Sequence, residues 1–209
     1  MNYYSGTNRN FLSNLPQVTR FLIIANVAFF ALNFLMQGRI NYWLALYSPN
    51  TGLFKSYQLI SHMFLHAGFF HIFMNIFFGV YMFGRMLESY IGSQRFFILY
   101  FVSGLGAAGL QLLVYHIMGV QGAMVGASGA VYGILAAFAY LFPNVELMVF
   151  PFPVPVKAKY LIPGFLVLSV YQGLSNNPGD NVAHFAHIGG AVIGFIITLF
   201  WKKNQFRQY

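Results

Sequence analysis

Hydrophobic residues form six long runs along the chain, separated by short polar or glycine- and proline-containing segments. Breakers such as Gly92-Ser93 and Pro143-Asn144 separate several of the runs. Most runs approach the ~20 residues that an α-helix needs to cross a ~30 Å hydrocarbon core. The pattern predicts an all-α polytopic membrane protein with one domain over 1–209 and six transmembrane helices in a single bundle, at about 20–37, 69–89, 95–117, 128–143, 159–176 and 183–201.

The connection at 38–62 does not follow this pattern, because aromatic and charged side chains are mixed in it. Tyr42 and Trp43 lie there together with Arg39 and Lys55. Amphipathic aromatic rings and basic side chains are typical of the boundary between a membrane and water. We therefore expect this segment to lie in the interface rather than to cross the bilayer.

The composition supports the membrane prediction. The chain is 58% hydrophobic and only 7% charged, which is far from the usual range of soluble domains. It contains no cysteine, which excludes disulfides and a thiol nucleophile. A net charge of +8 is also compatible with nucleic-acid binding. However, the basic residues flank the apolar runs, so we expect the lipid bilayer, and no nucleic acid, as their partner.

The basic residues also predict an orientation. Arg39 and Lys55 lie in the first connection, whereas the other basic residues lie in the two tails or beside the second and fourth turns. Under the positive-inside rule, this asymmetry places the N- and C-termini in the cytoplasm. The basic residues assigned to that side are Arg9, Arg20, Arg85, Arg95, Lys157, Lys159, Lys202, Lys203 and Arg207.

Four polar residues are expected at a similar depth in the outer leaflet. The second, fourth and sixth helices run in the same direction, and each carries such a residue near its start: His71 and Asn75, then Ser128, then His187. A rise of ~1.5 Å per residue places all four within roughly 10 Å of a common depth. The fourth run is short, so Ser128 is expected below the membrane surface, with the loop at 118–127 dipping inward.

These residue types indicate nucleophilic chemistry. Serine is a weak nucleophile until a neighbouring base accepts its proton, and His187 is a suitable base. No carboxylate is expected near the pair, so we predict a dyad rather than a triad. Tyr132, one turn after Ser128, can pack under the imidazole of His187. The three acidic residues all belong to other parts of the predicted topology: Glu88, Glu146 and Asp180.

Attack on a peptide carbonyl also requires hydrogen-bond donors for the developing oxyanion. One well-placed donor contributes ~3 to 4 kcal/mol. The backbone N–H of Ser128 lies at a predicted helix N-terminus, and the side chains of His71 and Asn75 can donate as well. These three groups are the candidate oxyanion hole.

Glycines near these residues have predicted steric roles. Gly126 and Gly129 allow the backbone to approach the reacting carbonyl. Gly190 and Gly194 have the spacing of small-residue packing motifs, which lets the sixth helix close on the fourth.

Each feature has an ordinary alternative. Glycine-serine-glycine strings also serve as packing surfaces in membrane helices, and Asn75 can join helices by hydrogen bonds. The pairs His62/His66 and His184/His187 have spacings that suit metal or haem ligation. No HExxH motif occurs, which argues against an intramembrane zinc protease. Several polar residues converge at one depth inside the membrane, where burying a polar group costs free energy. This convergence favours catalysis without a metal.

Three motifs together resemble the rhomboid family of intramembrane serine proteases. They are His66 and His71 with Asn75 on the second helix, Gly126-Ala127-Ser128-Gly129 on the fourth, and His187 with Gly190 and Gly194 on the sixth. They occur in the order of that family and cover essentially the whole chain. The resemblance is to the minimal six-helix prokaryotic type.

The resemblance implies roles for individual residues. Ser128 would be the nucleophile, His187 the general base, and His71, Asn75 and the Ser128 amide the oxyanion hole. Two supporting residues would be His66 in the first loop and Tyr132 beside His187. The fifth helix and the loop at 176–182 would form a gate and cap.

The resemblance also implies an activity and a location. Substrates would be single-pass membrane proteins, cleaved in or near their transmembrane segment without any cofactor. The protein would lie in a bacterial plasma membrane, with the active site opening to the extracytoplasmic side. The alternative is a non-catalytic scaffold or chaperone that binds unstable transmembrane helices. The oligomeric state is left open.

Overall fold

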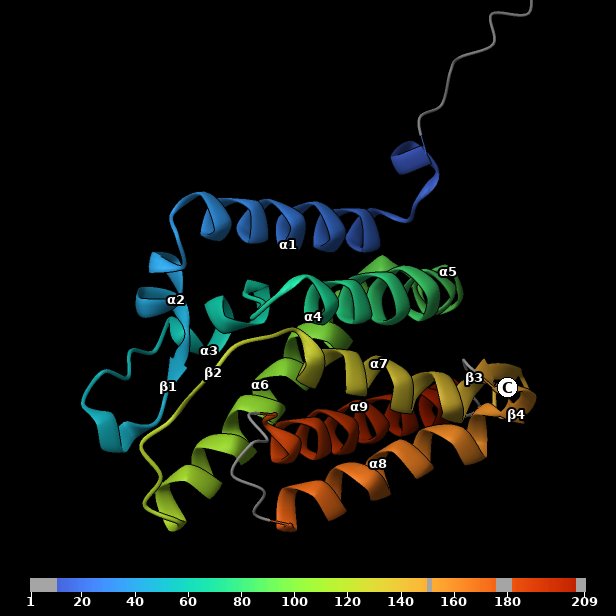
Figure 1. Ribbon diagram of the computed structural model, residues 1–209. Coiled ribbons are helices and arrows are strands. Elements are labelled where there is room, and N and C mark those ends of the chain that lie inside the picture. The colour runs from blue at the N-terminus through green and yellow to red at the C-terminus, as the bar shows by residue number, and fades with distance from the viewer. Residues whose placement is uncertain (1–10, 150–151, 176–181, 206–209) are drawn as a thin grey trace, which may run out of the picture.

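The structure is a computed structural model that describes residues 11–149, 152–175 and 182–205. This part of the chain is mainly helical (Figure 1). Its helical elements are η1 (Phe11–Asn14), α1 (Gln17–Leu35), α2 (Arg39–Leu44), η2 (Pro49–Thr51), α3 (Gln58–Ser61), η3 (His62–Phe64), α4 (Phe69–Phe73), η4 (Met74–Gly84), α5 (Arg85–Ile91), α6 (Ser93–Ile117), α7 (Ser128–Leu141), α8 (Ala158–Leu174) and α9 (His184–Gln205). The strands are β1 (Leu46–Tyr47), β2 (Ala123–Met124), β3 (Glu146–Val149) and β4 (Phe152–Lys157).

All six predicted hydrophobic runs are helical, with ends within a few residues of those expected. Four helices are long and apolar enough to cross a membrane: Gln17–Leu35, Phe69–Ile91, Ser93–Ile117 and His184–Lys203. The second of these is continuous through α4, η4 and α5, and η4 is wound as a π-helix. Helix α7 is apolar but has only 14 residues, and α8 contains Pro163. The chain is an integral membrane protein.

Two antiparallel strand pairs depart from the all-α prediction. β1 pairs with β2 through Leu46 and Met124, and β3 pairs with β4 in the turn between α7 and α8. Extended backbone outside the helices needs hydrogen-bond partners, and these pairs supply them. The β1–β2 pair also joins the 38–62 connection to the loop that leads into α7. Hydrophobic periodicity does not reveal pairs this short.

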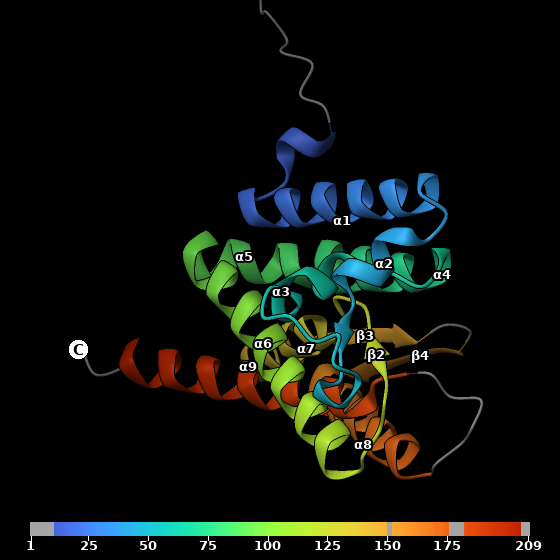
Figure 2. The same ribbon diagram turned by 90° about the vertical axis from the view of Figure 1, so that its left-hand side faces the viewer.

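Helix α9 packs against both α6 and α7 through glycine contacts (Figures 1 and 2). A Cβ atom at Gly190 would overlap the backbone of Gly129, and one at Gly194 would lie 2.5 Å from the Cα atom of Gly133. Neither position of α9 tolerates a side chain without a shift of α7. This close contact between backbones brings the first turn of α9 next to that of α7.

Glu88 connects three helices near the start of α1. Its side chain is only 2% exposed. The carboxylate accepts hydrogen bonds from the backbone amides of Val18 (2.9 Å) and Thr19 (2.7 Å), from the Thr19 hydroxyl (2.7 Å) and from the Ser93 hydroxyl (2.6 Å). The first N–H groups of a helix have no partner within the helix and favour a negative charge. Glu88 therefore caps α1 from another helix.

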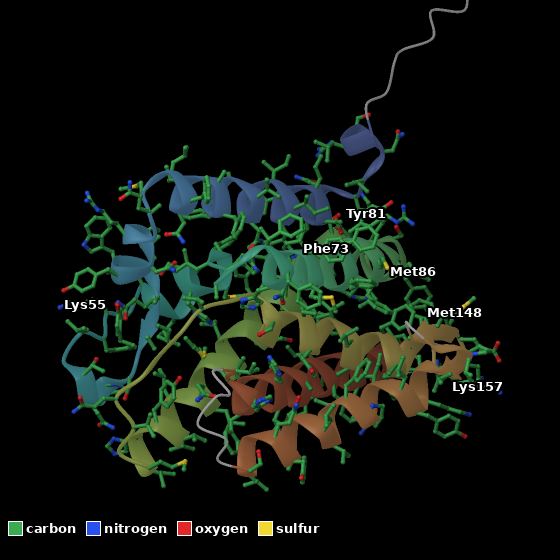
Figure 3. All side chains as sticks on the ribbon, in the orientation of Figure 1. Lys55, Phe73, Tyr81, Met86, Met148 and Lys157 are labelled. Carbon is green, nitrogen blue, oxygen red and sulfur yellow. The ribbon has the colours of Figure 1, made fainter. Side chains whose placement is uncertain are left out.

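Basic side chains at the end of the bundle that contains Glu88 lie over aromatic rings. The guanidinium of Arg85 is 5.0 Å from the ring centroid of Tyr81, and the ammonium of Lys202 is 4.6 Å from that of Tyr140. In Figure 3, Lys157 lies at this end and Lys55 at the opposite one. Arg85 and Glu88 are close in sequence, yet Arg85 faces an aromatic ring and Glu88 is buried.

The interfacial connection has exposed rings of Tyr42 and Trp43, as expected for a segment at a membrane boundary. The predicted cap falls mostly on 176–181, outside the described residues. The terminal residues 1–10 and 206–209 are outside them as well.

Candidate active site

The first turns of α7 and α9 bring a serine and a histidine into hydrogen-bond contact. Ser128 is the first residue of α7, and His187 lies in the first turn of α9. His187 Nε2 is 3.0 Å from Ser128 Oγ. This distance allows the imidazole to accept the hydroxyl proton. His187 is buried and Ser128 is half-buried, so the pair is partly shielded from the surroundings.

The imidazole of His187 is held by two further residues. The ring of Tyr132 stacks on it, with centroids 4.2 Å apart and an interplanar angle of 10°. On α8, Ser169 Oγ is 3.5 Å from His187 Nδ1 and 3.3 Å from the Tyr132 hydroxyl. Ser169 is 3% exposed. Residues of α7 and α8 therefore both hold the imidazole of His187 in place, with its Nε2 atom facing Ser128.

Ser169 is a site residue that the sequence analysis missed. The available signal was a hydroxyl in the middle of an apolar run, where a polar group is costly unless it has a partner. Serine is common in membrane helices, however, and periodicity alone did not show which face of α8 meets α9.

His71 lies beside the loop that precedes Ser128. Its Nδ1 atom accepts a hydrogen bond from the Ala67 amide at 3.3 Å, which favours the tautomer with the proton on Nε2. A Cβ atom at Gly126 would lie only 2.8 Å from His71 Nε2, and Gly126 has φ +130°. Only glycine is suited to both conditions. The Nε2–H donor of His71 therefore lies beside Gly126, two residues before Ser128.

Asn75 lies one turn after His71 and is 5% exposed. One N–H of its side-chain amide donates to the His71 carbonyl at 2.9 Å. An amide has two N–H groups, so a second donor remains for another acceptor. Gly79, four residues further along η4, packs closely on Val131 of α7. This contact places the Asn75 side of η4 against the start of α7.

Two buried histidines support this region. The ring of His66 packs edge-on against His71, with centroids 5.0 Å apart. His62 Nδ1 is 2.7 Å from the Gln58 carbonyl, to which it can donate, and the His62 carbonyl accepts from the Gly126 amide at 2.9 Å. Burial lowers the pKa of His62 to about 4 and that of His66 to about 3. Both rings are therefore neutral at pH 7.

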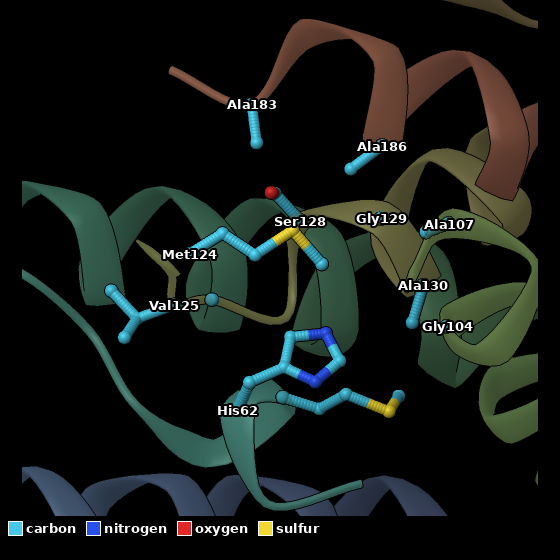
Figure 4. Close-up of a pocket in the computed structure, with 12 residues that line it drawn as sticks. His62, Gly104, Ala107, Met124, Val125, Ser128, Gly129, Ala130, Ala183 and Ala186 are labelled. Atoms are coloured by element: carbon cyan, nitrogen blue, oxygen red, sulfur yellow. The ribbon is translucent and has the colours of Figure 1, made fainter. Parts of the chain in front are cut away.

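A small cavity of about 10 Å³ adjoins Ser128 (Figure 4). Its lining includes His62, Gly126, Ala183 and Ala186. Its size is at the lower end of the ~10–15 Å³ that a single water molecule requires. With Nδ1 of His62 bound to Gln58, Nε2 of this neutral ring can accept a hydrogen bond. The cavity can hold a water molecule next to the serine.

Gly129 lies in a close contact between helices. A Cβ atom there would overlap Ala107 of α6, and it would lie 3.5 Å from the Ala186 carbonyl. The missing side chain therefore allows three helices to pack closely. The expectation that Gly126 and Gly129 allow the backbone to approach the reacting carbonyl stays a prediction.

The histidine pairs do not form a metal cluster. Among the described residues, no three histidine, cysteine or acidic side chains gather as a potential metal site. The rings of His184 and His187 are 5.9 Å apart, and His187 contacts Ser128 instead.

The fold defines the class of the protein, which is an integral membrane protein built mainly of helices. Comparison with known proteins then shows its family. The Rhomboid domain family matches residues 54–204. The chain belongs to the rhomboid family.

Three relatives illustrate the range of the family. The chain is 32% identical over 155 residues to "Rhomboid protein 1, mitochondrial" of Saccharomyces cerevisiae, covering 72% of this chain and 43% of that protein. It is 27% identical over 194 residues to "Rhomboid protease GlpG" of Serratia proteamaculans, covering 91% and 64%. It is 28% identical over 155 residues to "Putative rhomboid protease YdcA" of Bacillus subtilis, covering 73% and 71%. The chain thus spans less than half of the yeast relative.

Proposed function

We propose that this chain is an intramembrane serine endopeptidase with Ser128 as nucleophile and His187 as general base. The observation that carries the proposal is the 3.0 Å contact between Ser128 Oγ and His187 Nε2. Two of the relatives above are named proteases, which supports a serine protease class at the level of the family.

In the proposed acylation step, Ser128 and His187 act together on the scissile peptide. Ser128 Oγ attacks the carbonyl carbon of the scissile peptide while its proton passes to His187 Nε2. The carbonyl oxygen becomes an oxyanion, and the donors proposed for it are the Ser128 amide, His71 Nε2–H and the second N–H of Asn75. His187 then gives its proton to the leaving amine as the C–N bond breaks. The product is an ester between the substrate and Ser128.

Deacylation requires a water molecule beside that ester, and the cavity next to Ser128 and His62 can supply it. His187 takes a proton from the water, whose oxygen attacks the ester carbonyl. The C–O bond to Ser128 breaks, and the serine recovers its proton from His187. The proposal needs no cofactor or metal. A dyad has no carboxylate to orient the imidazole, and here Tyr132 and Ser169 have that role.

The remaining features of the proposal concern the membrane. We place the six predicted helices, including the short α7, in the bilayer as one domain, with cytoplasmic termini and an extracytoplasmic active site. The separation of Arg39 and Lys55 from the other basic residues supports this orientation. Substrates would be single-pass proteins cut in or near their membrane segment. The similarity to bacterial relatives supports a bacterial plasma membrane.

The test uses purified protein in detergent and a single-pass substrate with a destabilised transmembrane helix. A fluorophosphonate probe should label Ser128, and cleavage should require both members of the dyad. A folded protein that neither reacts with the probe nor cleaves the substrate, under conditions where related proteases do both, would contradict the proposal. A scaffold would retain substrate binding and function after Ser128→Ala.

A further inference from the structure

An apolar groove separate from the active-site cavity opens between α7, α8 and α9. It has a volume of about 650 Å³ and shares no lining residue with the cavity beside Ser128. Binding sites for small molecules typically have ~300–1,000 Å³, so the groove is large enough for a ligand. Its apolar walls include Ala139, Ile162, Leu166, Val170, Val192 and Phe195.

Small residues and a proline account for the hollow. The alanine side chains of Ala136, Ala139 and Ala191 form part of its lining, where larger side chains would fill the space. Pro163 also lines it and lies inside α8, where its missing N–H removes one helical hydrogen bond. Val192 of α9 is 49% exposed and Val170 of α8 is 38% exposed. In a membrane, such walls face lipid.

The length of the groove favours one kind of occupant. Along α8 it extends from Lys159 to Val170, which is ~16 Å at 1.5 Å per residue and about half of a ~30 Å hydrocarbon core. This length corresponds to an acyl chain within one leaflet, whereas a substrate helix that crosses the bilayer would extend beyond the groove.

One end of the groove carries positive charge. Lys159 lines it there, and the ammonium of Lys202 lies 4.6 Å from the ring centroid of Tyr140, another lining residue. The far end, near Val170 and Ile188, is apolar. The geometry points to a specific site for an anionic phospholipid. One acyl chain lies in the groove, and the phosphate lies beside Lys159 and Lys202.

Native mass spectrometry of the purified protein tests this site, with added phosphatidylglycerol compared with phosphatidylcholine. One phosphatidylglycerol should bind preferentially. Each lysine near the headgroup is expected to contribute about fivefold in affinity. Lys159→Gln and Lys202→Gln should each weaken binding by that factor, whereas Lys55→Gln, at the other end of the bundle, should not.

Filling the groove gives a second measurement. Val192→Trp, or Val170→Trp from the opposite wall, should remove the bound phosphatidylglycerol. Val102→Trp is the matched control, because Val102 is 39% exposed on α6 and does not line the groove. Thermal melting establishes that each variant is folded, and having two filling variants allows for the failure of one.

Four results would overturn the site. Equal retention of both lipids, or equal loss in Val102→Trp, would indicate nonspecific lipid around the bundle. Equal weakening by Lys55→Gln would indicate general charge attraction. Retained lipid together with a raised KM for a transmembrane substrate in Val192→Trp would assign the groove to the substrate. Lipid binding is measured without cleavage, so the result is independent of the proposed protease activity.

Discussion

Two buried polar clusters differ in the lengths of their hydrogen bonds. Around Glu88, four donors lie 2.6 to 2.9 Å from the carboxylate oxygens. Around His187, the hydrogen-bond contacts are 3.0 to 3.5 Å long. They join the imidazole to Ser128 and to Ser169, and Ser169 to the Tyr132 hydroxyl. A cavity adjoins Ser128. The first cluster has short hydrogen bonds to one carboxylate, whereas the second has longer contacts and adjoins a cavity.

This difference separates a structural site from a candidate reactive one. Short hydrogen bonds to a charged group are strong and leave that group little capacity for new bonds. Longer contacts beside a cavity allow the groups to rearrange around a substrate, as in catalytic sites whose hydrogen bonds tighten only in the complex. Substitutions at Glu88 should therefore affect stability, and substitutions at the dyad should affect reaction rate.

The largest expected effect is the loss of the nucleophile or base. Ser128→Ala and His187→Ala should each lower kcat by about 10⁴-fold or more, since each removes a member of the catalytic unit. Cleavage of a transmembrane substrate in detergent measures this effect. Thermal stability should change little, and Ser175→Ala, at an exposed serine of the same chain, should keep full activity. An active Ser128→Ala variant would refute the assignment.

Glu88→Ala should have the opposite profile. It removes the cap of α1 and leaves the amides of Val18 and Thr19 without their acceptor, at an expected cost of about 4 kcal/mol in the free energy of unfolding. Denaturant titration in detergent measures this loss. Glu146→Ala, at an exposed carboxylate, should cost less than about 0.5 kcal/mol. If the two variants were equally stable, the capping role would be wrong.

Asn75→Ala is expected to slow the reaction by about 10²-fold, which corresponds to about 3 kcal/mol of lost oxyanion stabilisation. The change should appear in kcat rather than in KM, because the bond forms mainly in the transition state. Asn75→Asp keeps the size but places an anion beside the oxyanion, so it should not restore activity. A rise in KM alone would assign Asn75 to substrate binding or helix packing.

Stability should fall in mild acid because of His62 and His66. An unfolded imidazole takes up a proton near pH 6.5, whereas folded His62 does so only at about pH 4. The unfolded state therefore binds more protons between these values. The stabilisation is complete above pH 6.5 and declines as the pH falls toward 4, by at most about 3 kcal/mol for His62.

Thermal melting between pH 8 and pH 4 measures this decline. His62→Gln should reduce its slope, because the variant has no imidazole to protonate at that position. The exposed His116→Gln control should leave the slope unchanged. An identical slope in all three proteins would exclude His62 as its source.

The smallest effect is expected at Ser169. Ser169→Ala should reduce kcat by less than tenfold, since its hydroxyl is 3.5 Å from His187 Nδ1 and Tyr132 still stacks on the ring. A positioning role also predicts a shift in the pH dependence of kcat, with recovery in Ser169→Thr. A change confined to thermal stability would indicate packing alone.

More of the fold than of the local side-chain contacts could be predicted from the sequence. The positions of the six helical runs followed from hydrophobic length. The N-terminal positions of Ser128 and His187 in their runs led to the prediction that both lie at a similar depth. The acceptor role of Glu88 was not predictable, because the backbone amides it binds have no sequence signature. Ser169 was missed because the rotation of α8 depends on packing by all its neighbours.

His187 follows Ser128 by 59 residues, and this spacing has a consequence during biosynthesis. At ~5–20 residues per second, a ribosome needs roughly 3 to 12 seconds to add that length. During this interval, the growing chain contains the proposed nucleophile without its base. Hydrolytic capacity would therefore arise only after α9 has been made and has docked beside α7, which protects other newly inserted proteins from premature cleavage.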